Sequence, residues 1–294
     1  MALVINTNVS ALNGARNLAN TQAQQAQTFQ RLSTGLRVNS AKDDAAGLYL
    51  AQSQTKDIRG LAMATRNAGD GISMAQTAEG ALDQITANLQ RINELAIQSA
   101  NGTYNSAARE GLQKEVNQLT QEIARIIETT EFNGQKLLNS SAIAITMQVG
   151  NQNGSAYRVD AGLSGGLAAA LSGGSISGAA SALNAIVDGG LLGTAVIDIR
   201  TQSAAQQAIA NTRAAIDGVS AERATFGAVM NRFEAVISGN QIYSENLQAA
   251  RSRIQDADFA VETSNLAKQQ VLQQAGVAAL GQANASSQVV LGLL

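Results

Sequence analysis

One apolar row constrains this chain more than any other feature of its sequence. Six residues follow one another at intervals of seven without an exception: Leu61, Ala68, Ala75, Leu82, Leu89 and Ala96. A strict seven-residue apolar repeat is typical of helices that pack side by side in a coiled coil. The row therefore predicts a long helix over residues 57–100 that needs partner helices along its length.

Two further segments repeat apolar residues at a spacing that suits the same bundle. Between 112 and 126 the spacing alternates between four and three residues, and between 202 and 247 a row recurs at every seventh position. Because a helix with an apolar stripe buries it against a neighbour, we expect the three segments to pack together, with Leu82 facing Ile123 and either Phe226 or Phe233. The expected core seam comprises Leu61, Leu82, Leu89, Ile123, Phe226 and Phe233.

The two ends of the chain also have helical patterns, over 5–32 and 256–290, but Ala supplies most of their apolar residues. The chain contains no proline, which suits long helices because an interior proline costs about 3 kcal/mol. Helices that bury mainly alanine gain little free energy per residue, so this composition favours self-association. Because helical patterns occupy both ends and the irregular part lies between them, we expect the two termini to lie together.

The middle of the chain changes pattern. Residues 142–160 alternate around a turn-like stretch and predict a β-hairpin. Residues 161–195 contain nine Gly and a single charged residue, Asp188, which is typical of a loosely built segment or a long loop. A connector at 33–40 precedes the long helix; Gly35 is expected to end the first helix there, and Asn39 or Ser40 to cap the next one.

The expected fold class is mainly α. It is a long antiparallel coiled-coil-like helical bundle with paired N- and C-terminal helices, plus a small β-hairpin and irregular central region. We expect a terminal-helix domain from 1–45 plus 255–294, and a helical core domain from 46–160 plus 200–254. Residues 161–199 would form a small Gly-rich variable surface region.

The composition excludes most enzymatic chemistry. The chain has no His and no Cys, so the commonest metal ligand, the thiol nucleophile and the disulfide are all missing. We therefore expect no catalytic site, no cofactor and no metal. The carboxylate pairs Asp43/Asp44 and Asp256/Asp258 would suit a general acid and base, but acids near helix starts usually cap helices, and we favour that interpretation.

Charge and hydropathy exclude two further kinds of partner. The 20 Lys and Arg residues face 22 Asp and Glu residues, a formal net charge of −2, so no basic surface for nucleic acid is expected. No apolar run reaches the ~18 residues of a membrane span, so no membrane partner is expected. The N-terminus lacks the basic flank and cleavage site of a secretory signal peptide, which by itself predicts a cytosolic protein.

Three motifs resemble one known family, the bacterial flagellins. The segment RLSTGLRVNSAKDDAAG at 31–47 resembles the N-terminal flagellin signature, and LQRINELAIQSAN at 89–101 resembles a further flagellin block. The segments SRIQDADFA at 252–260 and LQQAG at 272–276 resemble the C-terminal signature. The resemblance covers roughly residues 1–160 and 200–294, which is the whole chain apart from its Gly-rich middle.

The resemblance implies a structural subunit that self-assembles, as a homo-oligomer of many copies, into the extracellular filament of the bacterial flagellum. It also implies export in an unfolded state through the flagellar type III channel, which revises the cytosolic prediction, and partners in a flagellar export chaperone, the filament cap and the hook-junction proteins. The terminal helices would pair and line the inner tube of the filament. We assign the self-assembly contacts to Leu12, Ala19, Ala26, Phe29, Leu32, Phe259, Leu266, Leu272 and Leu280.

Two alternatives stay open from the sequence. One is the hook–filament junction protein of the same family, which shares the terminal helices. The other is a flagellin-like surface adhesin or a glycan-degrading enzyme built on the same scaffold.

The resemblance of the 89–101 block also implies contact with a flagellin-sensing Toll-like receptor of animals. The residues that match this contact are Gln90, Arg91, Glu94, Leu95, Gln98 and Glu115. Leu95 flanks the seven-residue row at Ala96, so we expect its side chain to point outward from the bundle. The plainer interpretation is a solvated Arg and Glu beside an ordinary coiled-coil Leu.

Overall fold

The computed structural model of the chain describes residues 8–138, 145–160 and 197–291. Most of these residues lie in five α-helices: α1 (Val9–Thr34), α2 (Ala45–Ala100), α3 (Ser106–Thr129), α6 (Gln202–Gln255) and α7 (Phe259–Leu291). The fold is therefore mainly α, as the apolar spacing predicts. The helix expected over 57–100 begins earlier, at Ala45.

Side-chain caps explain where the helices begin. The Asn8 Oδ1 accepts a hydrogen bond from the Ala11 N–H at 3.0 Å to start α1, and the Asn105 Oδ1 does the same for Ala108 in α3 at 2.8 Å. The Asp44 Oδ1 accepts from the Gly47 N–H at 2.9 Å at the start of α2. The prediction that Asn39 or Ser40 caps this helix is wrong, because the chain turns for four more residues before it becomes helical.

The end of α1 follows the prediction for Gly35. This residue has φ +70° and its N–H donates to the Arg31 carbonyl at 2.8 Å. A left-handed backbone conformation of this kind costs glycine nothing and ends a helix cleanly.

Two short antiparallel strand pairs accompany the helices. The pair β3 (Thr146–Gln148) and β4 (Arg158–Asp160) places Met147 opposite Val159, which confirms the hairpin prediction over its described part. The segment 142–144 of that prediction lies outside the described residues. A second pair, β1 (Glu131–Phe132) with β2 (Gln135–Lys136), was not predicted. The turn between these strands contains Asn133 (φ 52°) and Gly134 (φ 77°). An Asn-Gly pair is the strongest short-range hairpin signal in a sequence.

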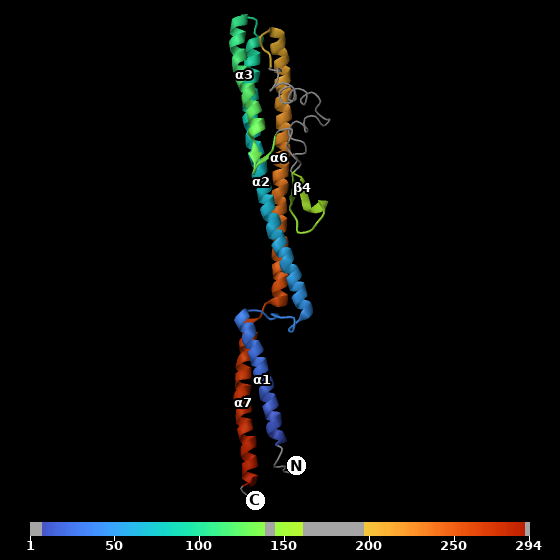
Figure 1. Cartoon of the computed structure of the whole chain (residues 1–294), viewed down its shortest axis with the longest axis vertical. Coiled ribbons are helices and arrows are strands. Elements are labelled where there is room, and N and C mark those ends of the chain that lie inside the picture. Colours follow the sequence, from blue (N-terminus) through green and yellow to red (C-terminus); the bar gives the residue numbers. More distant parts are fainter. Residues whose placement is uncertain (1–7, 139–144, 161–196, 292–294) are drawn as a thin grey trace. The chain divides into compact units, whose positions relative to one another are not determined.

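The chain divides into two compact units, residues 1–58 with 245–294 and residues 59–244. The divisions fall within α2 and α6, whereas the sequence places its boundaries near the connectors at 45 and 255. In the first unit, α1 and α7 lie side by side, as Figure 1 shows. The Asn8 Nδ2 donates to the Ala283 carbonyl at 3.1 Å, so the outer parts of the first and last described helices lie together.

The second unit contains the apolar core, in two clusters. The larger one joins α2, α3 and α6 and includes Leu82, Ile123 and Phe226, each no more than 1% exposed. The smaller one joins Ala68 and Phe233 to Val149 and Val159 of the β3–β4 region. Of the two aromatic partners considered for Leu82, Phe226 therefore shares its cluster and Phe233 belongs to the other.

The residues just before α6 pack into the larger cluster. Ile199 is fully buried, and its N–H donates to the Gln113 Oε1 at 2.7 Å while the Gln113 Nε2 donates to the Ile197 carbonyl at 2.7 Å. Residues 197–199, assigned by the sequence to the variable surface region, thus contribute to the bundle.

Candidate functional site

The pair of helices α1 and α7 differs from every other packed region in what it buries. No apolar residue of either helix is among the buried residues described; the two that are buried are Thr28 and Glu262, at 5% and 6% exposure. The helices approach through small residues: a Cβ built on Gly14 would lie 2.8 Å from the Leu280 Cδ2. Over the residues whose burial is described, the pair therefore has contacts but no hydrophobic core.

The residues assigned to self-assembly lie in this pair, and most of them are exposed. Phe29, Phe259, Leu12 and Leu272 are 65%, 56%, 54% and 47% exposed. Ala19 and Ala26 are exposed as well, while Leu32, Leu266 and Leu280 are partly buried. Exposed large apolar side chains at this density indicate a surface that another chain covers.

Four further large apolar residues described in the pair share this exposure and are not among the residues assigned to assembly from the sequence. They are Val9, Val261, Val271 and Val277, each more than half exposed. Residue type alone would have found them, since β-branched apolar residues stand out in helices made mainly of Ala, Gln and Asn.

The carboxylate pairs that would suit a general acid and base lie at the connectors next to the pair. The Asp43 Oδ2 accepts from the Ser40 N–H and the Ser40 hydroxyl, both at 3.0 Å, and the Asp258 Oδ1 accepts from the Ala260 N–H at 2.9 Å. The hydrogen bonds from Ser40, first from its backbone, lower the pKa of Asp43. These carboxylates therefore cap and brace the backbone.

The guanidinium of Arg37 ties the two connectors together. It donates to the backbone carbonyls of Arg253 and Ile254 at 3.3 and 2.7 Å, and the Arg37 N–H donates to the Gln255 carbonyl at 2.7 Å. Leu36 and Asp256 also form an isolated antiparallel bridge. The two signatures at 31–47 and 252–260 thus meet through their backbones.

The residues matched to receptor contact lie on α2 and α3, and they do not all share one surface. Arg91 donates to the Glu115 Oε1 at 2.9 Å and to the Glu94 Oε2 at 3.0 Å, and all three side chains are exposed. The hydrogen bond to Glu115 is the main cause that raises the pKa of Arg91. Gln90 and Gln98 are also exposed.

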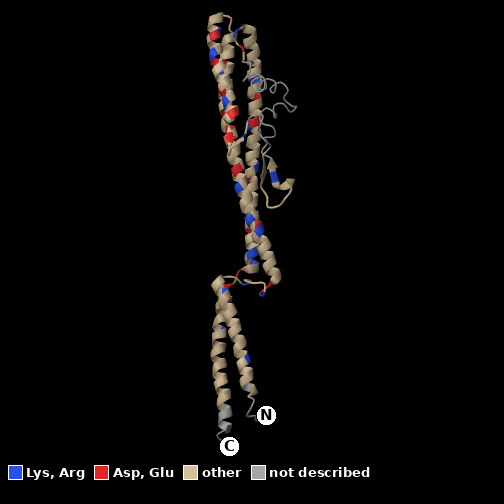
Figure 2. Cartoon of the chain, in the orientation of Figure 1, with Lys and Arg blue, Asp and Glu red and all other residues tan. Residues whose placement is uncertain are grey.

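Leu95 is the exception, and its expected outward orientation is wrong. It is 1% exposed and belongs to the larger apolar cluster. The reason is that α2 contributes to a cluster that also contains α3 and α6, so its buried face is wider than one seven-residue row. Figure 2 shows charged residues distributed along α2, α3 and α6 and very few along α1 and α7.

The core-seam residues are all buried. Leu61 is 3% exposed, and Leu82, Leu89, Ile123, Phe226 and Phe233 are at 0–1%. Arg223, which interrupts one apolar row of the sequence, lies at the edge of this seam and pairs with Asp83 and Glu79 of α2 at 3.0 and 3.7 Å.

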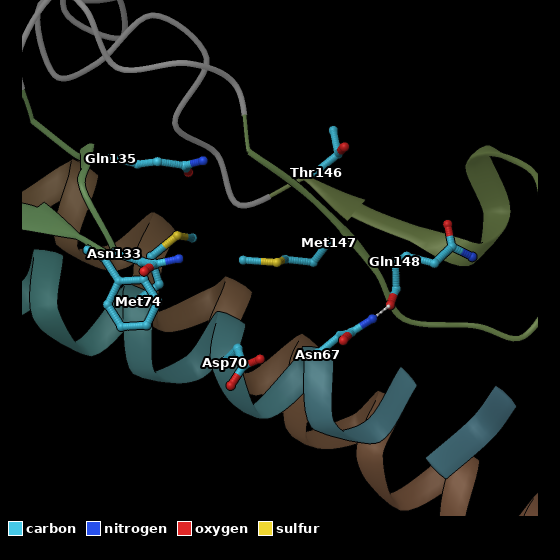
Figure 3. A pocket seen from close by; sticks show the side chains of 9 residues that line it. Asn67, Asp70, Met74, Asn133, Gln135, Thr146, Met147 and Gln148 are labelled. Atoms are coloured by element: carbon cyan, nitrogen blue, oxygen red, sulfur yellow. Dashed lines mark hydrogen bonds between the residues drawn. The ribbon is translucent and has the colours of Figure 1, made fainter. Parts of the chain in front are cut away.

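An open cavity of about 710 Å³ lies between α2 and the strand pairs (Figure 3). Met74 and Met147 form part of its wall, and Asp70, Asn133 and Gln135 supply polar groups. The Asn67 Nδ2 already donates to the Gln148 carbonyl at 2.9 Å, which joins helix to strand across it. The described residues hold no group of three or more carboxylates that could bind a metal ion.

No helix among those described has the length and hydropathy needed to cross a membrane.

The sequence is similar to known proteins along most of its length. The family model for the bacterial flagellin N-terminal helical region matches residues 5–142, and that for the bacterial flagellin C-terminal helical region matches residues 209–294. A flagellin of Halalkalibacterium halodurans is 40% identical over 292 residues, covering 99% of this chain and all of that protein. Flagellin D of Vibrio anguillarum is 35% identical over 376 aligned positions that span both chains completely.

Two solved structures align with this chain. A flagellar hook-associated protein from Vibrio parahaemolyticus aligns with a TM-score of 0.56 at 11% identity and covers 73% of this chain and all of that one. The Bacillus cereus flagellin aligns with a TM-score of 0.47 at 27% identity and covers 60% of this chain and 88% of that one.

Proposed function

The chain belongs to the bacterial flagellin family, and on that premise we propose which of its surfaces carry the family's structural role. The chain is a structural subunit of the flagellar filament and not an enzyme. Its homologues form that filament, which is extracellular. The junction-protein alternative is not favoured, since the curated relatives are flagellins and the hook-associated structure, at 11% identity, shares only the fold.

We propose that the exposed apolar face of α1 and α7 is the surface that other copies cover. The observation that carries this proposal is the absence of a buried apolar residue among those described in the two helices. Fixing a residue's backbone costs roughly 1–2 kcal/mol, and the pair's own contacts offset little of that. Contacts with other copies would supply the missing burial.

Limited proteolysis tests this proposal. We expect residues 1–45 and 255–294 to be cleaved rapidly in the monomer and to be protected in filaments grown by salting out, as checked by electron microscopy. The bundle helices α2, α3 and α6 are the internal control, because their buried core should resist the protease in both states. Equal resistance of the terminal segments in monomer and filament would contradict the proposal.

We propose further that the chain leaves the cell unfolded through the flagellar type III channel, with an export chaperone before transit and the hook-junction and cap proteins at the filament. Family membership supports this route. The composition is compatible with it, because a chain without Cys has no disulfide to undo and one without Pro has no slow X-Pro isomerisation on refolding. A strain without the flagellar export gate should retain the chain inside the cell.

The Gly-rich segment at 161–195 is proposed to face solvent and to tolerate changes in length. The segment lies outside the described residues. Its single charged residue and its lack of periodicity support the proposal. Shortening it by about ten residues, a loop-scale change, should leave polymerisation intact. Loss of filaments would indicate that the segment packs between subunits.

A second capability, contact with an animal Toll-like receptor, is proposed for the exposed group around Arg91. Its ion pairs with Glu94 and Glu115 present a fixed charged surface. In a receptor-reporter assay, Arg91→Ala should lower the response, whereas Arg125→Ala should not, although Arg125 also has an exposed ion pair, with Glu122. Equal responses from both variants would contradict this assignment. Because Leu95 is buried, a change there would act through the fold of the bundle.

A further inference from the structure

The terminal helix pair carries very few charges, and one of them is unique. The charged residues of α1 are Arg16 and Arg31, and those of α7 are Glu262 and Lys268. Glu262 is therefore the sole acidic residue in either helix. Any arrangement of the pair that separates Glu262 from Arg31 leaves a cation with no counter-charge from these helices.

The structure joins these two residues across the pair. The Arg31 Nη1 lies 3.1 Å from the Glu262 Oε1, and the two side chains are 29% and 9% exposed. Arg31 occupies the last turn of α1 and Glu262 the first turn of α7, so each charge also complements the dipole of its own helix. This is the best-buried ion pair among the described residues.

Other polar groups near the ion pair also depend on how α1 and α7 are aligned. The Gln269 Nε2 donates to the Thr28 Oγ1 at 3.1 Å, one to two turns from the ion pair along the same seam. The Arg31 Nε and the Gln269 Oε1 are already buried without a hydrogen-bond partner. A shift of one helix along the other would add Thr28, Glu262 and the Arg31 Nη1 to these unpaired groups, and unpaired buried polar groups are costly.

The apolar contacts between the helices discriminate little between alignments. Leu280 approaches Gly14, and Leu18 approaches Gly276 with 3.5 Å between the Leu18 Cδ1 and a Cβ built on the glycine. Both contacts involve the ends of flexible Leu side chains, and Ala and Gln are the commonest residues of the two helices. A pair of this composition could slide by a turn and find similar apolar contacts.

We propose that the Arg31–Glu262 ion pair sets the register in which α1 and α7 pair. The proposal rests on the filament function, since register matters where many copies must present the same surface. Arg31 and Glu262 are positioning residues in this scheme. A single buried polar pair in an otherwise permissive helix seam is a known way to fix alignment.

Charge exchange tests the pairing in the full-length chain. We expect Arg31→Glu and Glu262→Arg, each alone, to raise the concentration needed for filaments about 100-fold, because each leaves two like charges in the seam. The double variant should recover at least about tenfold of that loss; reversed charges at the two helix ends keep recovery incomplete. A double variant no better than the poorer single variant would overturn the proposal.

Lys268→Glu is the matched control. Lys268 lies on the same helix, is exposed and has no ion pair among the described residues. Its reversal changes the net charge by the same amount as Arg31→Glu and should change the filament threshold far less than Arg31→Glu does. An equal loss would attribute the effect to net charge and would also overturn the proposal.

Pairs of engineered cysteines can report the register of α1 and α7 by cross-linking, because the chain contains no natural cysteine. Leu18→Cys with Gly276→Cys reports the alignment seen here, and Leu18→Cys with Ala283→Cys reports a slide of seven residues. With a short thiol cross-linker in filaments, we expect the intrachain product that joins positions 18 and 276 to dominate. Adding Glu262→Gln should lower its yield at least about fivefold relative to the natural charge pair, since neutral Gln leaves Arg31 unpaired in every register.

An unchanged yield in the Glu262→Gln background would overturn the proposal. If that variant forms no filaments, the charge-exchange pair decides the question. The filament function is tested separately: the unaltered chain must polymerise under the same conditions. Failure there would contradict the function, whereas normal polymerisation with no rescue and no change in cross-linking would contradict only the role of the ion pair.

Discussion

The two units of this protein differ in how far they bury their large apolar side chains. In the bundle of α2, α3 and α6, residues such as Leu82, Ile123 and Phe226 are almost completely buried within one chain. In the pair of α1 and α7, no large apolar residue is buried among those described, and Phe29 and Leu12 are more than half exposed. The comparison teaches that apolar content alone does not tell whether a helix is stabilised inside its own subunit or by its neighbours.

The largest effect should come from a charge placed in the bundle core. Leu82→Asp removes a fully buried Leu and buries a carboxylate, which should cost about 5 kcal/mol or more and lower the melting temperature of the monomer by at least about 10 °C. Circular dichroism of the monomer measures this. Ala87→Asp, an exposed site on the same helix, adds the same charge and should leave melting nearly unchanged. Unchanged melting of Leu82→Asp with loss of filaments would instead make this row a subunit interface.

Replacing a Phe by Ala in each unit should affect the stability of the monomer very differently. Phe233→Ala in α6 should destabilise the monomer by about 3 to 5 kcal/mol, because the ring is fully buried. Phe29→Ala in α1 should change monomer stability by less than about 0.5 kcal/mol. It should raise the concentration needed for filaments about 10- to 100-fold, the loss expected if the ring is buried by another copy. Similar monomer melting of the two variants would remove the distinction between the units.

Two glycines of α2 differ in how closely the rest of the bundle approaches them. A Cβ on Gly71 would lie 2.7 Å from the Phe233 Cζ, whereas one on Gly69 would meet nothing within 4 Å. Gly71→Ala should therefore destabilise the monomer by about 1 to 2 kcal/mol. Gly69→Ala should stabilise it by about 0.5 to 1 kcal/mol through helix propensity. Urea unfolding of the two monomers measures both signs, and equal shifts would mean that the Phe233 ring relaxes freely.

The smallest predicted effect concerns a carboxylate of α6. Burial raises the pKa of Glu222 above its ordinary 4.5, so the unfolded chain ionises at a lower pH than the folded one, and stability falls as pH rises through 4.5. Glu222→Gln should stabilise the bundle at pH 7 by less than about 1 kcal/mol, because solvent still reaches the side chain. Melting at several pH values should show the gain vanishing below about pH 4. A gain that persists in acid would assign it to packing.

Much of the fold could be predicted because its signals are periodic and long. The row through Leu82 predicts the central helix, and Gly35 predicts the end of the first one. The orientation of Leu95 could not be predicted from that row, because the width of a helix's buried face depends on how many neighbours contact it. The register of α1 against α7 could not be predicted either, because two helices rich in Ala and Gln repeat with few distinguishing features. Polar contacts such as the Arg31–Glu262 ion pair and the Gln269–Thr28 hydrogen bond become visible only in the structure.

The hydrogen bond between Asn8 and Ala283 has a practical consequence for anyone who wishes to label this protein. A fluorophore attached at Asn8 or at Ala283 would lie beside the same stretch of the α1–α7 pair, so moving the label from one helix to the other would not avoid interference with assembly. The turn between β3 and β4 offers a better position, because Gln152 and Asn153 are exposed there. A small tag inserted at that turn should report on subunits while leaving both chain ends unmodified.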